Sequence, residues 1–163
     1  MIQVVVGDLA CQRVDAVLRP ADAALRPVGP AAVRLDQAGG TRFADQRRSA
    51  TPLEAGAAVV TGGGDLPSGF VLHVVVADER GPAGRDKIRR ALVSAWQRAG
   101  DWGLPRVAAP LIGVEHGALT SEESARLLVE TYPSGAVPDA ELRIVVGAAE
   151  RELVEAIVGR TQA

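Results

Sequence analysis

The feature that most restricts the fold is an alternation of short apolar runs with longer amphipathic segments. The short runs, each closed by turn residues, cover residues 2–6, 16–18, 57–61, 70–76, 106–110 and 142–146. Between several of them apolar residues recur at helical spacing, most clearly over residues 85–99, where Ile88, Leu92 and Trp96 share one face. This alternation predicts an α/β fold with a mostly parallel sheet that is covered on both faces.

Proline and glycine residues predict where several elements begin and end. Arg19-Pro20 is predicted to end the second strand. Pro30 begins a helix that is predicted to end at Gly39 or Gly40. Residues 41–50 are polar and rich in arginine, and they predict a short exposed helix or a loop.

The strands at residues 57–61 and 70–76 have no helix between them and are therefore predicted to pair antiparallel. Gly62-Gly63-Gly64 follows the first of them, but no helix start and no nucleotide-binding glycine pattern follows, so we interpret it as a turn. Thr120 and Glu123 predict a capping box at the start of a later helix, and a final helix is predicted around residues 149–157.

Composition places the chain among ordinary globular proteins. With 163 residues, 47% of them hydrophobic, it is predicted to fold as one domain spanning residues 1–163. A net charge of −2 gives no general attraction to nucleic acid, and no apolar stretch is long enough to span a membrane. The single cysteine, Cys11, fits a reducing cytoplasm, and with two histidines it offers too few ligands for a metal site. We expect no cofactor.

Two aspartates and two histidines are the first candidates for a functional site. Asp8 and Asp22 follow the first two strands, and folds of this class bind ligands beyond the carboxyl ends of their strands. For both aspartates two interpretations stay open, ligand contact or hydrogen bonds to their own turns. His116, in the glycine-containing loop of residues 110–119, is the better candidate for ligand contact. His73 lies within a strand and is interpreted as structural.

A series of motifs occurs in order along nearly the whole chain. The first are Gly7-Asp8-Leu9 and Val14-Asp15-Ala16-Val17-Leu18, the latter followed by Arg19-Pro20-Ala21-Asp22. The later ones are Ala38-Gly39-Gly40, Gly56-Ala57-Ala58-Val59-Val60-Thr61, Leu66-Pro67, Val71-Leu72-His73 and Ala109-Pro110-Leu111-Ile112-Gly113. Together they resemble the macro domain family, in which a G-D-I turn precedes V-D-A-I-V-N-A-A-N.

The resemblance implies a three-layer α/β/α sandwich with a mixed, mostly parallel sheet and a cleft that binds ADP-ribose or a related nucleotide. It implies that Asp8 accepts a hydrogen bond from the adenine amino group and that Leu9 supplies a backbone N–H. The loops around the rest of the ligand would contribute a larger set of residues: Ala21, Asp22, Gly29, Gly113, Val114, Glu115, His116 and Gly117.

The chain departs from the family at the ribose and phosphate end. Arg19 and Asp22 stand in place of two asparagines, and the family's run of glycines is reduced to Gly29, with no acidic residue after it. The family's G-T-G becomes Gly113-Val114-Glu115, which puts a carboxylate where bare backbone would approach phosphate. Pairing of Arg19 or Arg26 with Glu115 or with a phosphate would offset this charge.

These departures favour a divergent, bacterial-type macro domain that is a nucleotide-binding or protein-interaction module with little or no hydrolase activity. The alternative is an active ADP-ribosyl or O-acetyl-ADP-ribose hydrolase with Asp22 or Glu115 as general base and His116 as acid, which requires their loops to meet. A third alternative is a structural or oligomeric role in which the protein's own side chains fill the cleft. The sequence names no protein partner.

Overall fold

The computed structural model describes residues 1–48 and 53–162. Seven strands form one sheet in the order β1-β7-β6-β2-β4-β3, with β5 paired to the outer part of β4. The strands are β1 (Ile2–Val6), β2 (Ala16–Asp22), β3 (Ala58–Gly62), β4 (Phe70–Asp78), β5 (Gly81–Pro82), β6 (Arg106–Ala109) and β7 (Glu141–Val146). The pairs β1·β7, β7·β6, β6·β2 and β2·β4 are parallel, whereas β3 and β5 run antiparallel to β4. The mixed, mostly parallel sheet and the antiparallel β3·β4 pair confirm the predictions from the sequence.

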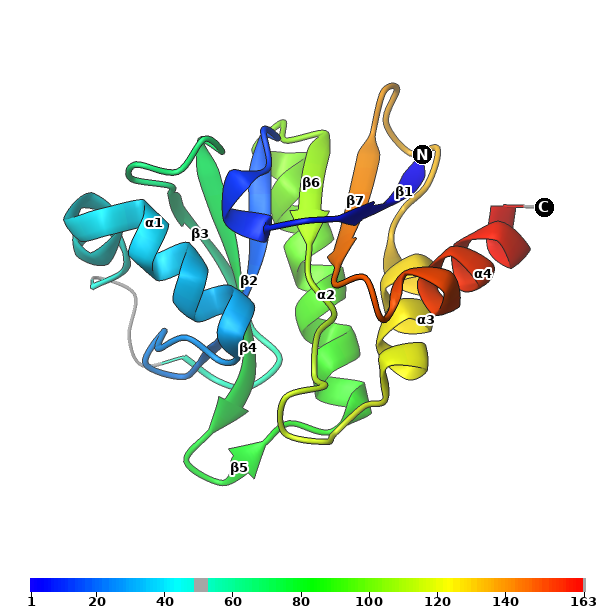
Figure 1. Cartoon of the computed structure of the whole chain (residues 1–163). Helices are drawn as coiled ribbons and strands as arrows, with labels where there is room; N and C mark the ends of the chain where they lie inside the picture. The colour runs from blue at the N-terminus through cyan, green and yellow to red at the C-terminus, as the bar shows by residue number, and fades with distance from the viewer. Residues whose placement is uncertain (49–52, 163) are drawn as a thin grey trace.

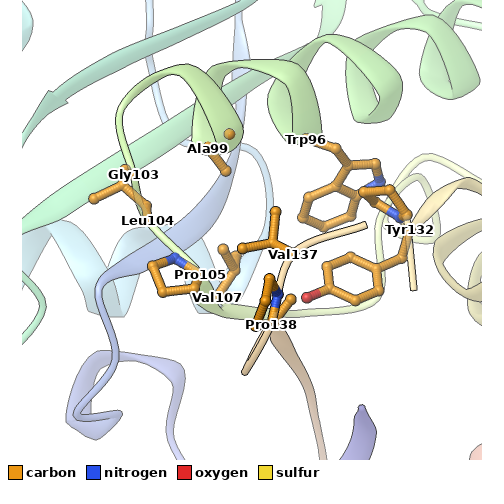
Figure 2. Close-up of a pocket in the computed structure, with 12 residues that line it drawn as sticks. Trp96, Ala99, Gly103, Leu104, Pro105, Val107, Tyr132, Val137 and Pro138 are labelled. Carbon is orange, nitrogen blue, oxygen red and sulfur yellow. The ribbon is translucent and has the colours of Figure 1, made fainter. Parts of the chain in front are cut away.

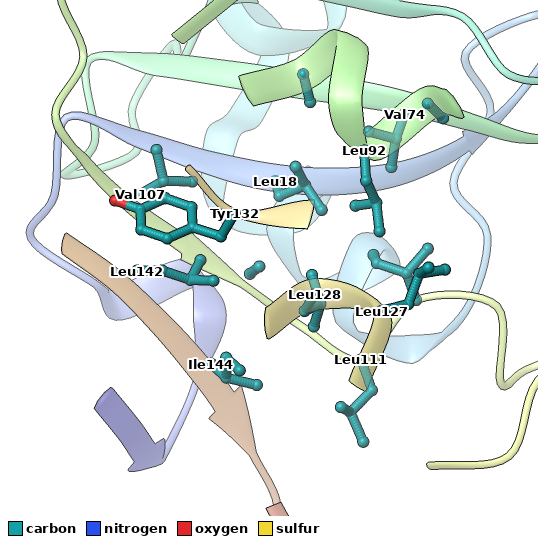
Figure 3. Close-up of a cluster of buried hydrophobic side chains, with 14 of the residues drawn as sticks. Leu18, Val74, Leu92, Val107, Leu111, Leu127, Leu128, Tyr132, Leu142 and Ile144 are labelled. Atoms are coloured by element: carbon teal, nitrogen blue, oxygen red, sulfur yellow. The ribbon is translucent and has the colours of Figure 1, made fainter. Parts of the chain in front are cut away.

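Helices cover both faces of the sheet (Figure 1). On one face lie α1 (Pro30–Arg47) and the short 3-10 helix η1 (Leu9–Cys11), and on the other lie α2 (Arg85–Asp101), α3 (Ser121–Thr131) and α4 (Arg151–Gln162). The larger apolar core packs β2, β4, β6 and β7 against α2 and α3, where Leu18, Leu92, Leu128 and Ile144 are buried (Figure 3). The predicted three-layer α/β/α sandwich is therefore confirmed.

Strand β2 is longer than its sequence pattern predicts. Arg19 and Pro20 were expected to end it, but it continues to Asp22. Pairing with β6 covers only Ala16 and Val17, and the carbonyl of Pro20 accepts from the N–H of Val28 in the following loop. The N and O atoms of a strand residue point to the same side, so Pro20 is not required to donate to β4 and the ladder loses no hydrogen bond there.

The element α1 consists of two helical segments that meet at Gly40, where φ is 67° and ψ is −164°, values outside the helical range. The first segment therefore ends at Gly39-Gly40, as predicted, and a second short helix continues to Arg47. Beyond Gly40 the side chain of Phe43 is fully buried, which explains why this polar segment is helical. The carbonyl of Gly39 accepts from the N–H of Asp65 outside the helix. The last two residues of the predicted 41–50 segment lie outside the described residues.

The start of α3 is as predicted. Thr120 accepts a hydrogen bond from the N–H of Glu123, and the Glu123 side chain accepts from the N–H of Thr120. Among the described residues, no helix combines the length and the apolar character needed to cross a membrane.

Candidate functional site

A hollow of about 380 Å³ opens at the carboxyl edge of the sheet, beside the ends of β1, β6 and β7. The residues after β1 and the first turn of α1 form its two sides, and they include Asp8, Leu9, Pro30, Ala31 and Arg34. The ends of β6 and β7 close it with Pro110 and Gly147, among others. Asp8 and Leu9 thus lie at the sheet edge where the sequence predicted ligand contact, and we call this feature the base hollow.

Asp8 holds the loop after β1 in shape and carries a charge into the base hollow. Its Oδ1 accepts from the N–H of Ala10 at 3.0 Å and so caps η1. Its Oδ2 accepts from Nε of Arg34 at 3.0 Å and also contacts Nη2 of Arg34. These hydrogen bonds, that from Arg34 above all, hold the pKa of Asp8 below its usual value although partial burial opposes them. The carboxylate is therefore ionised at neutral pH, and it accepts from its own turn and from α1.

Leu9 offers a donor next to this acceptor. As the first residue of η1, it carries one of the N–H groups that a helix start leaves without a partner inside the helix. Its side chain is buried, which fixes the backbone.

Asp22 stands at the same edge as Asp8 but on a different strand, with β7 and β6 between β1 and β2. Its Oδ1 accepts from the N–H groups of Ala24 and Arg26 at 2.9 Å, and its Oδ2 accepts from Nε of Arg26 at 2.7 Å. Of the two interpretations left open for Asp22, the structure shows the turn. The neighbouring Ala21 is fully buried in β2.

The loop after β6 meets the start of α1 at one point. Glu115 packs on Gly29, because a Cβ built on Gly29 would lie 2.5 Å from Cγ and 2.6 Å from Oε1 of Glu115. Gly29 has φ 90° and ψ 165°, a conformation essentially restricted to glycine, and it is the N-cap of α1. Burial raises the pKa of the Glu115 carboxyl. Glu115, whose carboxylate the sequence predicted near the ligand phosphates, therefore fills the space between the loop after β6 and the start of α1.

The other predicted residues of this loop shape its turn. Gly113 and Gly117 have positive φ values of 81° and 70°. The N–H of Gly117 donates to the carbonyl of Val114. His116 is exposed to solvent. Among the described residues, His116 has no hydrogen bond to Asp22 or Glu115, and the loops approach each other through Glu115 and Gly29.

Arg19 has a different role from the one considered in the sequence. Its side chain is fully buried under α1, where Nε donates to Oδ1 of Asp36 at 2.8 Å and Nη2 to Oδ2 at 2.9 Å. Arg26 likewise binds Asp22. Of the two pairings left open in the sequence, with Glu115 or with a phosphate, the structure does not show the one with Glu115, because Asp36 binds Arg19 and Asp22 binds Arg26.

The interpretation of His73 as structural agrees with its contacts. Its Nδ1 lies 3.1 Å from Nη1 of Arg19, which can only donate, so the ring proton is on Nε2. Nε2 then donates to Oγ1 of Thr61 at 2.7 Å. The ring also stacks on Phe43. Burial, with the charges of Arg19 and Arg47, lowers the pKa of His73 to about 3, so the ring is neutral.

The sequence did not identify Arg34 as a site residue. Arg34 is four positions after Pro30 and three after Ala31, and this spacing places all three on one face of α1. This spacing could have been used to place Arg34 beside the predicted loop at the start of the helix. Its contact with Asp8 joins residues 26 positions apart, and no local pattern indicates such a contact.

A second hollow, of about 280 Å³, lies at the opposite edge of the sheet, where β6 and β7 begin (Figure 2). The rings of Trp96 and Tyr132 meet edge to face at 5.3 Å, and Val137 and Pro138 complete the wall. Burial and the charge of Glu141 raise the pKa of Tyr132 to about 12. This hollow is apolar and distant from every predicted site residue. Within the described part of the chain, no three His, Cys, Asp or Glu side chains are grouped to hold a metal ion.

The sequence profile described as Macro domain matches residues 19–128, which include the loop before α1 and the loop after β6 but not Asp8 and Leu9. The chain belongs to the Macro domain family. A relative from Aeropyrum pernix is 34% identical over an alignment of 133 residues, and the match covers 77% of this chain and 67% of that protein. A relative from Mycobacterium tuberculosis is 28% identical over 76% of the chain. The chain matches 34% of that mycobacterial protein, about a third of its length.

Solved structures agree with this assignment. A Trypanosoma brucei macrodomain in complex with ADP-ribose superposes with a TM-score of 0.84 over 97% of this Macro domain and 69% of that chain. The two sequences are only 19% identical, so the likeness establishes the fold.

Proposed function

We propose that this Macro domain binds an adenine-containing nucleotide of the ADP-ribose type in the base hollow and is a binding or interaction module without the family's usual hydrolase activity. The supporting observation is that Asp8, with its ionised carboxylate, and Leu9, the first residue of η1, both line this hollow. The Trypanosoma brucei macrodomain was solved with ADP-ribose, which supports a ligand of the same class here.

The absence of hydrolase activity is proposed from the contacts of the candidate acid and base groups. Both carboxylate oxygens of Asp22 accept hydrogen bonds within its own turn. His116 is exposed, and Ala31 and Ala32 supply no acidic group to the first turn of α1. A general base must reach the reacting proton directly or through one water, and among the described residues no hydrogen bond joins His116 to Asp22 or Glu115.

Calorimetric titration of the protein with ADP-ribose tests the binding proposal. We expect the wild type to bind with a Kd above about 100 µM, and Asp8→Asn to bind at least about tenfold more weakly. The introduced amide would still cap η1 through its oxygen, but it would turn a donor toward the adenine amino group. Asp101→Asn, at the exposed end of α2, removes the same charge far from the hollow and serves as the control.

Equal affinity of Asp8→Asn and wild type would contradict the assignment of the base hollow. A micromolar Kd for wild type, or release of ADP-ribose from a modified protein substrate, would contradict the proposed loss of the usual site.

A further inference from the structure

The hollow between Trp96, Tyr132, Val137 and Pro138, which we call the apolar hollow, is large enough for a small molecule. Its volume is about 280 Å³, and it is lined by the end of α2, the residues around the start of β6, the residues after α3 and the loop before β7. An apolar cavity of about 150 Å³ holds benzene, so the apolar hollow has room for one substituted aromatic ring.

The walls of the apolar hollow exclude an ionic ligand. Among the described residues that line it, none is an aspartate, glutamate, lysine, arginine or histidine. The helices α2 and α3 both end here, and the carbonyl groups of a last helical turn repel an anion. An ion of either sign would be buried without a partner, which is unfavourable. The ligand that fits this hollow is therefore uncharged.

Two aromatic rings form the most rigid part of the wall. The rings of Trp96 and Tyr132 meet edge to face, with an angle of 87° between their planes. Nε1 of Trp96 donates to Oγ1 of Thr131 at 2.9 Å, which fixes the indole. Aromatic rings gain free energy from stacked or edge-to-face contacts beyond that of the buried area alone. An aromatic ligand is therefore favoured over an aliphatic one of the same size.

The hydroxyl of Tyr132 is available to a ligand. Tyr132 is only 8% exposed, and its hydroxyl points toward Pro138 among the side chains of the wall (Figure 2). Within residues 1–48 and 53–162 this hydroxyl makes no hydrogen bond. Burial and the charge of Glu141 raise the pKa of Tyr132 to about 12, so the hydroxyl keeps its proton and can donate it. A polar group without a partner at an apolar wall is unfavourable, and an acceptor on the ligand would satisfy it.

We propose that the apolar hollow binds a small uncharged aromatic molecule whose hydrogen-bond acceptor, a carbonyl or hydroxyl oxygen, contacts the hydroxyl of Tyr132. Such a site combines an apolar wall with one polar group that orients the ligand. It lies at the opposite edge of the sheet from the base hollow and shares no lining residue with it. The inference therefore goes beyond the proposed nucleotide binding and does not depend on it.

Amide NMR titrations of the isotope-labelled protein with acetophenone and with benzoate test the proposed site. The two probes have nearly the same shape, but acetophenone is uncharged and carries one carbonyl acceptor. Acetophenone should shift the amide signals of Gly100, Gly103 and Ala140, which line the apolar hollow, with a Kd of about 1 mM or below. Gly7 and Gly147 at the base hollow should not respond. Benzoate should bind at least about tenfold more weakly.

Tyr132→Phe removes only the hydroxyl. It should weaken acetophenone binding at least about threefold, because the donor to the carbonyl is lost. The hydrocarbon α-methylstyrene has the shape of acetophenone without its acceptor, so its affinity for the variant should stay within about twofold of that for wild type. The urea midpoint of Tyr132→Phe should match that of wild type, because the hydroxyl has no bond within the protein to lose. Val93→Ala, on the exposed face of α2, should bind both probes as wild type does.

Other results would overturn the inference. If millimolar acetophenone causes no saturable shifts at the apolar hollow, the hollow is not a binding site. Equal acetophenone affinities of wild type and Tyr132→Phe would show that the hydroxyl does not recognise the ligand, and equal affinities for benzoate and acetophenone would show that charge is not excluded. Shifts of the same amides when only the protein concentration is raised would show that a second copy of the chain covers the hollow.

Discussion

Arg19 shows how a single residue can change its role when the fold is complete. It points to the α1 face of β2, where Val17 before it packs into the apolar cluster with Leu35 and Phe43. There the guanidinium is satisfied by Asp36, by the carbonyl of Leu25 and by His73. A buried charge is tolerated only when it is paired and hydrogen-bonded, and this arrangement fulfils that condition.

His73, which belongs to the same buried cluster, predicts a pH dependence of stability. Its pKa is about 3 in the folded protein, whereas an unperturbed histidine has a pKa of 6.5. Below pH 6.5 the unfolded state therefore binds more protons, and the stability that is complete above this pH is lost as the pH falls toward 3. The free energy of unfolding should fall about 2 kcal/mol more between pH 7 and pH 5 in wild type than in His73→Gln.

Urea denaturation of both proteins at the two pH values measures this difference. His73→Gln is expected to be the less stable protein at pH 7, with the gap narrowing at pH 5. Parallel pH profiles for the two proteins would show that the ring is not held neutral.

The roles of these residues were only partly predictable. A histidine within a β-branched run indicates a buried, hydrogen-bonded ring, and His73 is one. The partner of Arg19 is 17 positions away on the next helix, and the pairing depends on how α1 docks on the sheet. Periodicity gives the face of a residue but not the residue opposite it.

At the scale of elements, the contact between the loop after β6 and the start of α1 is the feature that shapes the candidate site. Each part was visible in the sequence, Gly29 before Pro30 and Glu115 within a glycine-containing loop. Their contact was not visible, because it joins segments that the sheet order brings together. The length of β2 was unpredictable for the same reason, because it depends on a long-range pairing. Pro20 is tolerated within the strand only because the pairing of β2 with β6 has already ended.

Gly29→Ala tests this contact. The substitution should lower the free energy of unfolding by about 1–3 kcal/mol from backbone conformation alone, because φ is 90° and ψ is 165°. A further loss is expected from the overlap with Glu115. In a Glu115→Ala background the steric part should disappear, which gives a coupling of about 0.5–3 kcal/mol in a double-mutant cycle of chemical denaturation.

Additive effects of the two substitutions would show that Glu115 does not rest on Gly29 in solution. Val93→Ala, on the exposed face of α2, provides a distant partner for a control cycle that should be additive.

At the scale of the whole molecule, the two ends of the sheet differ in chemistry. The carboxyl edge holds charged groups from separate elements: Asp8 after β1 and Arg34 on α1 line the base hollow, and Glu115 after β6 packs on Gly29 at the start of α1. The opposite edge holds the apolar hollow around Trp96 and Tyr132. The order of strands and helices was enough to predict the fold. It also predicted the edge of the sheet at which a ligand would bind, because parallel α/β sheets bind ligands beyond the carboxyl ends of their strands.

The most direct test of this account is a two-dimensional amide NMR titration of the isotope-labelled protein with adenosine. We expect the largest shift changes at Gly7, Leu9, Ala31 and Gly147, which line the base hollow, and little change at Gly103 beside the apolar hollow. Saturable changes confined to the base hollow would support the assignment. Changes concentrated at the opposite edge of the sheet, or none at the base hollow with adenosine at millimolar concentration, would contradict it.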